Sequence, residues 1–371
     1  MLDIKRVAIV WESKTGGGVN SYLKYLLQSK AFVDKQITIF TNSSNRGAKS
    51  LIKDFQKQKN INFVFFNSFF VYRGKRNFLK KSIYYFLKPI FLILAIYRFK
   101  KILTNARFDA LLCMSGGYGN FQSQQAAILA VNKSKINVIS IVMFHACVKP
   151  PLFMSFILRI IHYFMVRTLT SLISVSRATR ETVLNNSSLL NDKRLETKII
   201  YPGVPKNNFI KKNYLNLKTI ENSEFMLKIG MVARIDPDKR HEDLIIAFSE
   251  LPTEYKKKMT LIFVGEDVDG YKIKLKNLVS NLNLEKKIEF TDFVEIDSKK
   301  IILSLDLLIS LSKYEGFGLS IAEAMSVGTP VLVTDVGGVN ELVSNDCGKL
   351  IKYGQRDEIK DSLIDFCDHK K

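Results

Sequence analysis

Short apolar runs alternate with segments of helical periodicity along the whole chain, and this alternation restricts the fold more than any other feature. Strands that alternate with helices form parallel sheets whose faces the helices cover. We expect strands over 6–12, 36–41, 61–66, 108–114, 136–144 and 171–176 in the first half, and over 227–234, 259–265, 287–293, 306–312 and 330–335 in the second. The clearest expected helices cover 18–29 and 120–132. The sequence therefore predicts an α/β fold.

A chain of 371 residues is too long for one ordinary core. The stretch from 201 to 224 has two prolines, many Asn and Lys residues and little periodicity. We therefore predict an N-terminal domain over 1–205, a linker over 206–226 and a C-terminal domain over 227–371. Open parallel sheets bind ligands at the carboxyl ends of their strands, so we expect the chemistry in a cleft between the two domains.

The excess of positive over negative charge lies entirely in residues 1–205. Residues 1–205 contain 31 Lys and Arg against eight Asp and Glu, whereas the formal net charge of the whole chain is +21. Between Asp54 and Glu181 the only acidic residue is Asp109. Such a one-sided field attracts a polyanion, either a nucleic acid or an anionic membrane surface.

Two segments, 82–101 and 151–169, combine apolar and aromatic side chains with cations. Basic residues and Pro89 interrupt them, so neither offers the roughly 20 apolar residues of a membrane span. Two interpretations stay open: the helices only pack on a sheet and have basic polar faces, or they also present an edge to an anionic membrane. No helix-turn-helix, zinc-finger or aromatic RNA-binding pattern accompanies the charge, which disfavours a nucleic acid partner.

The N-terminal apolar run ends at Glu12 and lacks a small-residue cleavage site, which predicts a first strand instead of a signal peptide. The four cysteines are far apart and form no C-x-x-C pair: Cys113, Cys147, Cys347 and Cys367. This spacing is typical of reduced thiols and not of a zinc site, so we expect a cytoplasmic protein.

Glycines and cations follow several of the expected strands. Residues 16–18 are three glycines between the first strand and a helix, where backbone N–H groups can approach a phosphate, although a plain strand-to-helix turn needs glycine too. Arg234 ends a strand and Lys239 follows five residues later. This pair suits a diphosphate, or else consists of two solvated loop cations near Asp236 and Asp238.

The stretch "KYEGFGLSIAEAMSVGTP" (313–330) predicts a loop, a short helix capped by Gly328 and the start of a strand. Glu315 lies in the loop and Glu323 in the first turn of the helix. Carboxylates accept hydrogen bonds from vicinal hydroxyls and helix N-termini hold anions, so this layout suits a nucleotide sugar. Alternatively, Ser320 and Glu323 form a capping box, which needs no ligand.

Glu315 and Glu323, with seven residues between them in "EGFGLSIAEAMSVGTPVLVTDVGG", resemble the E-x7-E signature of retaining glycosyltransferases of family 4, also called glycosyl transferases group 1. Other pieces resemble the family in the same order: "GGV" at 17–19, His145, "ISVS" at 173–176, "YPGV" at 201–204, Arg234 with Lys239, and "FVGE" at 263–266. The resemblance implies the GT-B fold, in which two Rossmann-like domains face each other across a cleft. Relatives usually continue past the last helix of the second domain.

The resemblance also implies roles for the residues. Arg234 and Lys239 would hold the donor diphosphate, Glu323 the ribose and Glu315 the donor sugar. His145 would contact the sugar near the reacting centre, although Ala146 replaces the acidic residue or glycine that often follows it in relatives. The other donor-binding residues would supply backbone contacts: Gly17, Gly18, Gly316, Phe317, Gly318 and Leu319.

Fixed cations and a helix dipole can stabilise the leaving group, so we expect neither a metal ion nor another cofactor. The implied reaction is hexose transfer with retention from a UDP- or GDP-sugar to a glycan or polyprenyl-linked acceptor. This would serve a surface polysaccharide, such as lipopolysaccharide or capsule, at the inner face of the plasma membrane. Two alternatives stay open: a nucleotide-sugar epimerase or hydrolase of the same fold, and a non-catalytic scaffold that binds nucleotide sugars.

Overall fold

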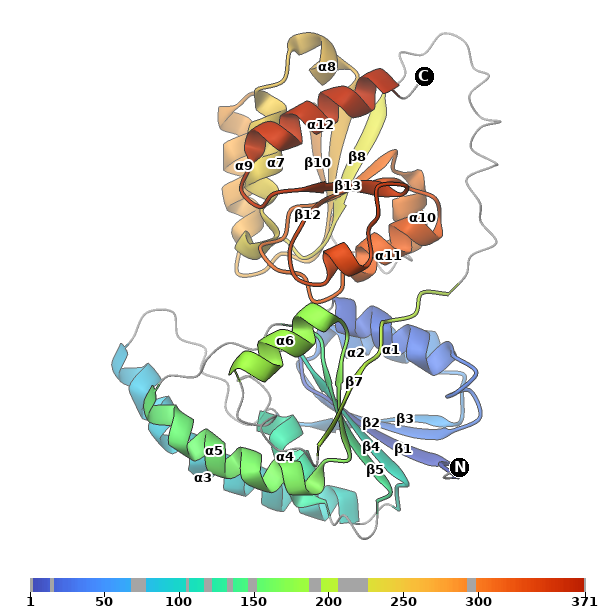
Figure 1. Cartoon of the computed structure of the whole chain (residues 1–371), viewed down its shortest axis with the longest axis vertical. Helices are drawn as coiled ribbons and strands as arrows, with labels where there is room; N and C mark the ends of the chain where they lie inside the picture. The colour runs from blue at the N-terminus through green and yellow to red at the C-terminus, as the bar shows by residue number, and fades with distance from the viewer. Residues whose placement is uncertain are drawn as a thin grey trace. The chain divides into compact units, whose positions relative to one another are not determined.

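The computed structural model describes residues 3–13, 17–67, 78–104, 107–116, 122–131, 136–145, 152–186, 195–205, 226–291 and 298–369. The chain divides into two compact units, Met1–Pro202 and Gly203–Lys371. Each unit is a parallel sheet with helices on both faces (Figure 1), which confirms the predicted fold class. Most of the predicted linker lies outside the described residues, so the domain boundaries stay predictions.

The sheet of the first unit has seven parallel strands in the order β3-β2-β1-β4-β5-β6-β7. Its strands are β1 (Arg6–Trp11), β2 (Gln36–Asn42), β3 (Ile61–Phe66), β4 (Ala110–Ser115), β5 (Val138–Met143), β6 (Ser171–Ser174) and β7 (Glu196–Ile199). Its helices are α1 (Gly18–Gln28), α2 (Arg46–Phe55), α3 (Phe78–Thr104), α4 (Gln122–Ala130), α5 (Leu152–Thr168) and α6 (Arg177–Asn186). The strand order changes direction beside β1, where open α/β sheets bind ligands.

One hydrophobic cluster joins the strands of this sheet to α3, α4 and α5. Helix α3 contributes a stripe at helical spacing, Leu92, Ala95, Phe99 and Leu103, and all four side chains are buried. Helix α4 contacts both α3 and α5, so the three helices form one layer on the same face of the sheet.

The sheet of the second unit has six parallel strands in the order β10-β9-β8-β11-β12-β13. Its strands are β8 (Leu227–Val232), β9 (Met259–Val264), β10 (Ile288–Thr291), β11 (Leu307–Ser310), β12 (Val331–Thr334) and β13 (Gly348–Ile351). Its helices are η4 (Pro237–Lys239), α7 (His241–Ser249), α8 (Thr253–Lys257), α9 (Tyr271–Asn281), α10 (Ser298–Ser304), α11 (Leu319–Ser326), η5 (Val339–Glu341) and α12 (Arg356–His369).

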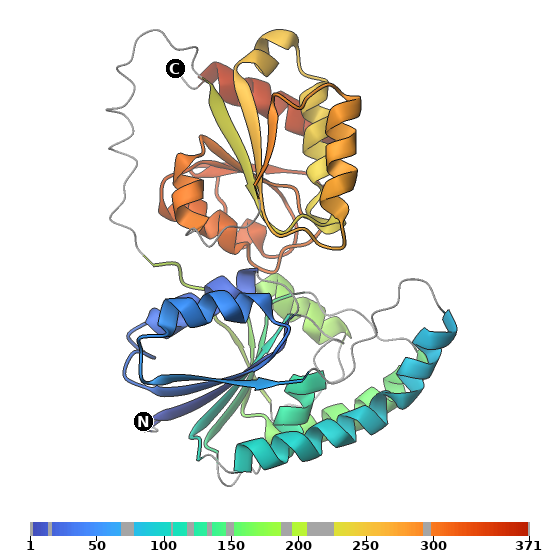
Figure 2. The ribbon, with the colours of Figure 1, turned by 180° about the vertical axis from the view of Figure 1, so that it is seen from behind.

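Two hydrophobic clusters cover the two faces of this second sheet. One joins the strands to α7, α9 and α12, and the other joins them to α10 and α11 (Figures 1 and 2). The strand β8 pairs with β11 in parallel, so both strands end at the same edge of the sheet. The loops that follow β8 and β11 therefore meet.

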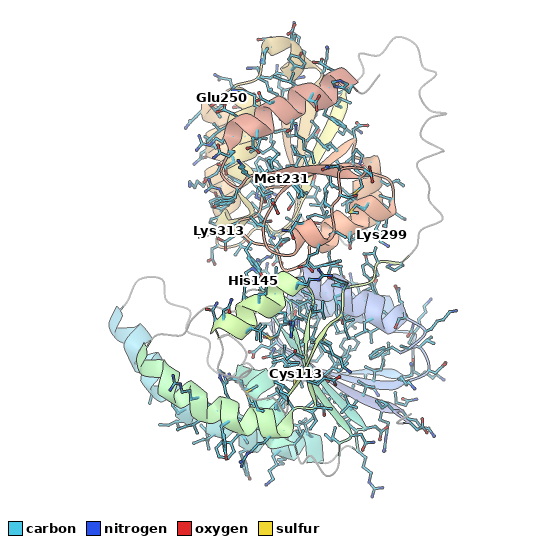
Figure 3. The ribbon with its side chains drawn as sticks, in the orientation of Figure 1. Cys113, His145, Met231, Glu250, Lys299 and Lys313 are labelled. Carbon is cyan, nitrogen blue, oxygen red and sulfur yellow. The ribbon has the colours of Figure 1, made fainter. Side chains whose placement is uncertain are left out.

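Among the residues that the structure describes, no helix combines the length and the apolar character needed to cross a membrane. Cys113, Cys347 and Cys367 carry free thiols, while Cys147 lies outside the described residues. Burial in the first core raises the pKa of the Cys113 thiol (Figure 3).

Candidate active site

The loops that follow β8 and β11 hold most of the predicted site residues. The loop after β8 contains Arg234 and the short helix η4, which ends at Lys239. The loop after β11 contains Glu315 and leads into α11. The backbone N–H of Lys313 donates to the carbonyl of Asp238 at 2.8 Å and fastens the two loops together.

Lys239 and Glu315 form the central contact of this site. Lys239 Nζ lies 3.0 Å from both Oε1 and Oε2 of Glu315, and 3.2 Å from Ser312 Oγ. The two side chains are only 15% and 17% exposed, so water screens this pair less than an ordinary surface ion pair. Glu315, which is predicted to bind the donor sugar, is thus in direct contact with Lys239, which is predicted to bind the diphosphate.

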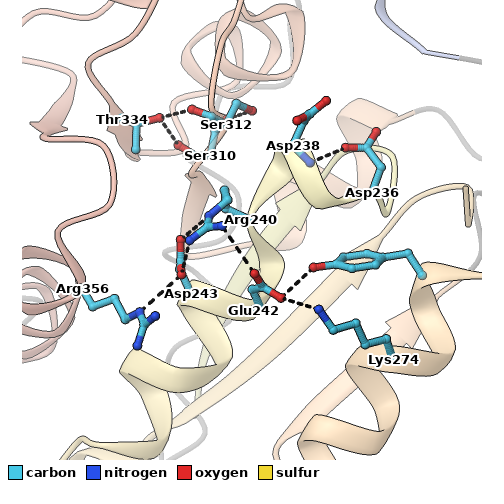
Figure 4. A network of polar contacts seen from close by, with 11 residues as sticks. Asp236, Asp238, Arg240, Glu242, Asp243, Lys274, Ser310, Ser312, Thr334 and Arg356 are labelled. Carbon is cyan, nitrogen blue, oxygen red and sulfur yellow. Dashed lines mark hydrogen bonds and ion pairs between the residues drawn. The ribbon is translucent and has the colours of Figure 1, made fainter. Parts of the chain in front are cut away.

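Ser312 was not predicted from the sequence, although it binds Lys239. Its side chain is buried, and Thr334 Oγ1 donates to the Ser312 carbonyl at 2.9 Å (Figure 4). The contact ties the loop to β12, the strand next to β11. Ser312 therefore holds the lysine ammonium in place from a rigid position.

Arg234 follows the end of β8 at the same edge. Its guanidinium lies 3.1 Å from Asp236 Oδ2 and its side chain is 41% exposed, so most of its donors remain accessible. The other oxygen of Asp236 accepts the N–H of Asp238 at 3.0 Å and caps η4. Asp236 thus orients both the arginine and the helix that carries Lys239.

Glu323 is buried, with 2% of its surface exposed, and accepts a hydrogen bond from Ser298 Oγ at 2.9 Å. The N-cap of α11 is Gly318 (φ 92°) and carries no side-chain hydrogen bond, so the capping box with Ser320 is wrong. The helix begins one residue before Ser320, which displaces that serine from the capping position. The predicted glycine after the helix is confirmed, because Gly328 has a φ of 76°.

Gly337, which was not predicted from the sequence as a site residue, packs against the backbone of Glu315. Gly337 has a φ of 59°, and a Cβ at this position would lie 2.0 Å from the carbonyl oxygen of Glu315. The next residue, Gly338, donates its N–H to that carbonyl at 2.9 Å. The two glycines after β12 therefore fix the backbone of the loop that carries Glu315.

Arg240, directly after Lys239, anchors η4 to the body of the second unit (Figure 4). It has a left-handed conformation (φ 57°), and its guanidinium donates to both oxygens of Asp243 at 2.6 and 2.9 Å. Arg356 of α12 lies 3.4 Å from the same carboxylate, while Glu242 accepts from Tyr271 at 2.8 Å. Hydrogen bonding to Asp243 raises the pKa of Arg240.

Three predicted residues belong to the first unit. Gly17 (φ 149°) is the N-cap of α1, and both Gly17 and Gly18 are exposed. His145 follows β5 and is exposed at the same sheet edge (Figure 3). Tyr22 of α1 packs edge-on against Phe144 with ring centroids 4.8 Å apart, which brings the two glycines and the histidine to the same region of the unit.

The chain contains two Asp-x-Asp sequences, 236–238 and 267–269. The Asp236 carboxylate contacts the Arg234 guanidinium and the backbone N–H of Asp238. Asp267 Oδ1 accepts a hydrogen bond from the backbone N–H of Lys272 at 3.0 Å. Within the described ranges, no group of three or more His, Cys, Asp or Glu residues is arranged to hold a metal ion. The expectation of a metal-free reaction stays a prediction.

Sequence comparison adds independent information on the second unit. Residues 218–371 match the family described as glycosyl transferases group 1. An uncharacterized glycosyltransferase of Methanocaldococcus jannaschii is 31% identical over 191 residues, which are 49% of this chain and 46% of that protein. An O-antigen chain mannosyltransferase of Salmonella typhimurium is 27% identical over 181 residues, 48% of this chain and 46% of that protein. The chain spans about half the length of these curated relatives.

Comparison with solved structures covers both units. The crystal structure of HepE from Anabaena in complex with UDP and glucose matches with a TM-score of 0.70 at 20% identity. The match covers 99% of this chain and 90% of that chain. The fold is therefore the GT-B fold.

Proposed function

Since residues 218–371 match the glycosyl transferases group 1 family and the chain has the GT-B fold, we propose that it transfers a hexose with retention from a nucleotide-diphosphate sugar to a glycan or lipid-linked acceptor. The relatives are glycosyltransferases by name, and HepE binds UDP and glucose. The donor for this chain is a UDP- or GDP-sugar.

The observation that carries this proposal is the contact of Lys239 with Glu315 at the ends of β8 and β11. A carboxylate beside an ammonium offers acceptors for sugar hydroxyls next to a cation for phosphate. Both side chains are shielded from water, which strengthens their interaction with a charged ligand. If Lys239 and Glu315 formed only a structural ion pair, a second, exposed cation at the same sheet edge would have no role, yet Arg234 lies there.

The donor diphosphate lies on Arg234, Lys239 and the N-terminal end of α11. Because Gly318 provides no side-chain cap, the first N–H groups of α11 are available to an anion. When the sugar–phosphate bond breaks, negative charge develops on the diphosphate, and fixed cations stabilise it without rearrangement. We propose that this set of donors replaces a metal ion, so activity persists in a chelator.

Glu323 binds the ribose hydroxyls in this proposal. Its buried carboxylate already accepts a hydrogen bond from Ser298, so the ribose hydroxyls share this acceptor. The alternative role is structural, with Glu323 fixing α10 to α11. Measurements of donor binding distinguish the two roles, because replacement of a purely structural glutamate would weaken the binding of every ligand of the second unit equally.

We further propose a role in surface polysaccharide synthesis at the cytoplasmic side of a membrane. The similarity to an O-antigen chain mannosyltransferase supports this role. The excess of cations in the first unit supports a membrane-bound acceptor, such as a polyprenyl-linked glycan. In the first unit, His145, Gly17 and Gly18 lie at one edge of the sheet, and we propose these residues for ligand binding.

A thermal-shift screen against UDP- and GDP-sugars tests the proposal. The native chain is stabilised by one class of donor. Lys239→Ala and Glu323→Ala abolish this shift, while Lys313→Ala, in the loop that carries Glu315, retains it. Equal stabilisation of all variants would contradict the site. Donor consumption without an acceptor, at the full transfer rate, would instead identify a hydrolase or epimerase.

A further inference from the structure

Helix α3 has a second apolar stripe that faces away from the core. The side chains of this stripe are strongly exposed: Ile90 (52%), Ile93 (66%), Leu94 (51%) and Tyr97 (71%). They recur at helical spacing opposite the buried stripe that begins at Leu92. The described part of α3 is therefore apolar on two faces, although only one of them packs on the sheet.

Helix α5 repeats this arrangement in the same layer. His162, Met165 and Val166 face inward and are buried, whereas Ile160, Tyr163 and Phe164 are 46%, 47% and 53% exposed. Together the two helices carry seven of the 15 large hydrophobic side chains that are exposed in the described residues. The concentration in one layer distinguishes this face from scattered surface residues.

Cations accompany both stripes. The exposed basic residues at the face are Arg98, Lys100, Lys101, Arg159 and Arg167. The Arg167 guanidinium lies 4.1 Å from the centre of the Tyr163 ring, an arrangement that keeps the cation beside the apolar stripe. No acidic residue occurs on α3, α4 or α5. The one acid in this part of the sequence, Asp109, accepts the N–H groups of Lys5 and Arg6 at 2.9 and 2.8 Å.

We propose that the outer face of α3 and α5 is a membrane-docking surface that binds an anionic lipid bilayer in the plane of its headgroups. The stripes of Ile93 and Tyr97 on α3 and of Phe164 on α5 insert into the boundary of headgroups and acyl chains, while the flanking cations bind lipid phosphates. The face lies on the bilayer and does not cross it, in keeping with the length and composition of its helices. This surface extends the proposed function, because it holds the first unit where a lipid-linked acceptor is anchored.

Other occupants fit the face less well. A second copy of the chain on the same face would bring two sets of cations together, which costs free energy, because α3, α4 and α5 contain no acidic residue that could pair with them across the contact. A nucleic acid would satisfy the cations but would leave the apolar stripe of Ile93, Leu94 and Tyr97 in water. A bilayer with anionic lipids satisfies both properties.

Flotation of the full-length chain with lipid vesicles tests this surface independently of catalysis. Vesicles of phosphatidylcholine are compared with vesicles that also contain phosphatidylglycerol, at low and high salt. The variants are Ile93→Asp and Lys101→Glu on α3. Their matched controls are Ile273→Asp and Lys276→Glu on α9, where Ile273 is 65% exposed and Lys276 is exposed.

The native chain floats with the anionic vesicles, less so at high salt, and not with neutral ones. Each α3 variant weakens the partition by about tenfold or more, whereas the α9 controls bind like the native chain. Equal binding by Ile93→Asp and Ile273→Asp overturns the proposal. So does a dimer, in sedimentation velocity, that only Ile93→Asp dissociates. A chain that binds vesicles but no nucleotide sugar keeps the surface and contradicts the proposed function alone.

Discussion

Removing the ammonium of Lys239 is expected to weaken nucleotide binding far more than removing the charge of Glu315. At 3.0 Å the Coulomb attraction of this pair is about 5 kcal/mol for an effective dielectric constant near 20. The partial burial of both groups offsets most of that attraction, so the net coupling is about 1–2 kcal/mol. A phosphate can therefore take the lysine away from the glutamate at little cost.

Lys239→Met removes a charge-assisted hydrogen bond to phosphate, worth about 1.5–3 kcal/mol. It also leaves Glu315 uncompensated beside the phosphate, which adds about 1 kcal/mol of repulsion. Together these terms weaken UDP binding by about 100- to 1,000-fold. Glu315→Gln frees Lys239 from its competitor, so UDP binds as tightly as to the native chain or about fivefold more tightly.

Isothermal titration calorimetry with UDP and with a UDP-hexose measures these differences. Glu315→Gln should retain UDP and lose affinity only for the UDP-hexose, since its predicted contact is to the sugar. The control is Lys313→Met, an exposed lysine of the same loop, with melting temperatures to verify folding. If Glu315→Gln loses UDP as severely as Lys239→Met, the pair is a structural bridge and the assignment of roles is wrong.

Three further predictions concern the support of the site. Gly337→Ala should destabilise the second unit by about 2–3 kcal/mol in urea unfolding, because its Cβ collides with the Glu315 carbonyl. The control Gly354→Ala has open space around its Cβ and should cost about 1 kcal/mol. Equal losses of stability in the two variants would contradict the collision. Asp243→Asn should cost about 2–4 kcal/mol, since the 4% exposed carboxylate faces two arginines, and a loss below about 1 kcal/mol would mean that the network is not structural. Burial lowers the pKa of His241 to about 3. Below pH 6.5 the unfolded chain therefore binds a proton that the folded chain does not, so the free energy of unfolding is fully retained above pH 6.5 and falls as the pH decreases toward 3. His241→Leu should flatten the pH dependence of unfolding between these values, and an unchanged profile would contradict this prediction.

The apolar periodicity predicted the central strands because each of them is buried on both faces and reads as a continuous apolar run. The strands β7 and β13 were not predicted. They are outer strands of four residues each, and their sequences, "ETKI" and "GKLI", contain at most two consecutive apolar residues. Such segments become strands only because a neighbouring strand supplies hydrogen bonds, which local sequence does not encode.

The residues of the candidate site also fall into those that the local sequence predicts and those that it does not. Glu315, Lys239 and Arg234 were predictable, since charged residues directly after apolar strands lie at the ligand-binding edge of a parallel sheet. Ser312 and Ser298 were not, because their partners lie 73 and 25 residues away in the chain. Glu323 fitted two interpretations in the sequence. Only the start of α11 at Leu319 excluded the capping box.

The most direct test of the account is a crystal structure of the chain with UDP bound. The account predicts that the β-phosphate lies within hydrogen-bonding distance of Lys239 Nζ and the Arg234 guanidinium, at the N-terminal end of α11, and that Lys239 has moved away from Glu315. A nucleotide bound elsewhere, with the contact of Lys239 and Glu315 intact at 3.0 Å, would contradict it.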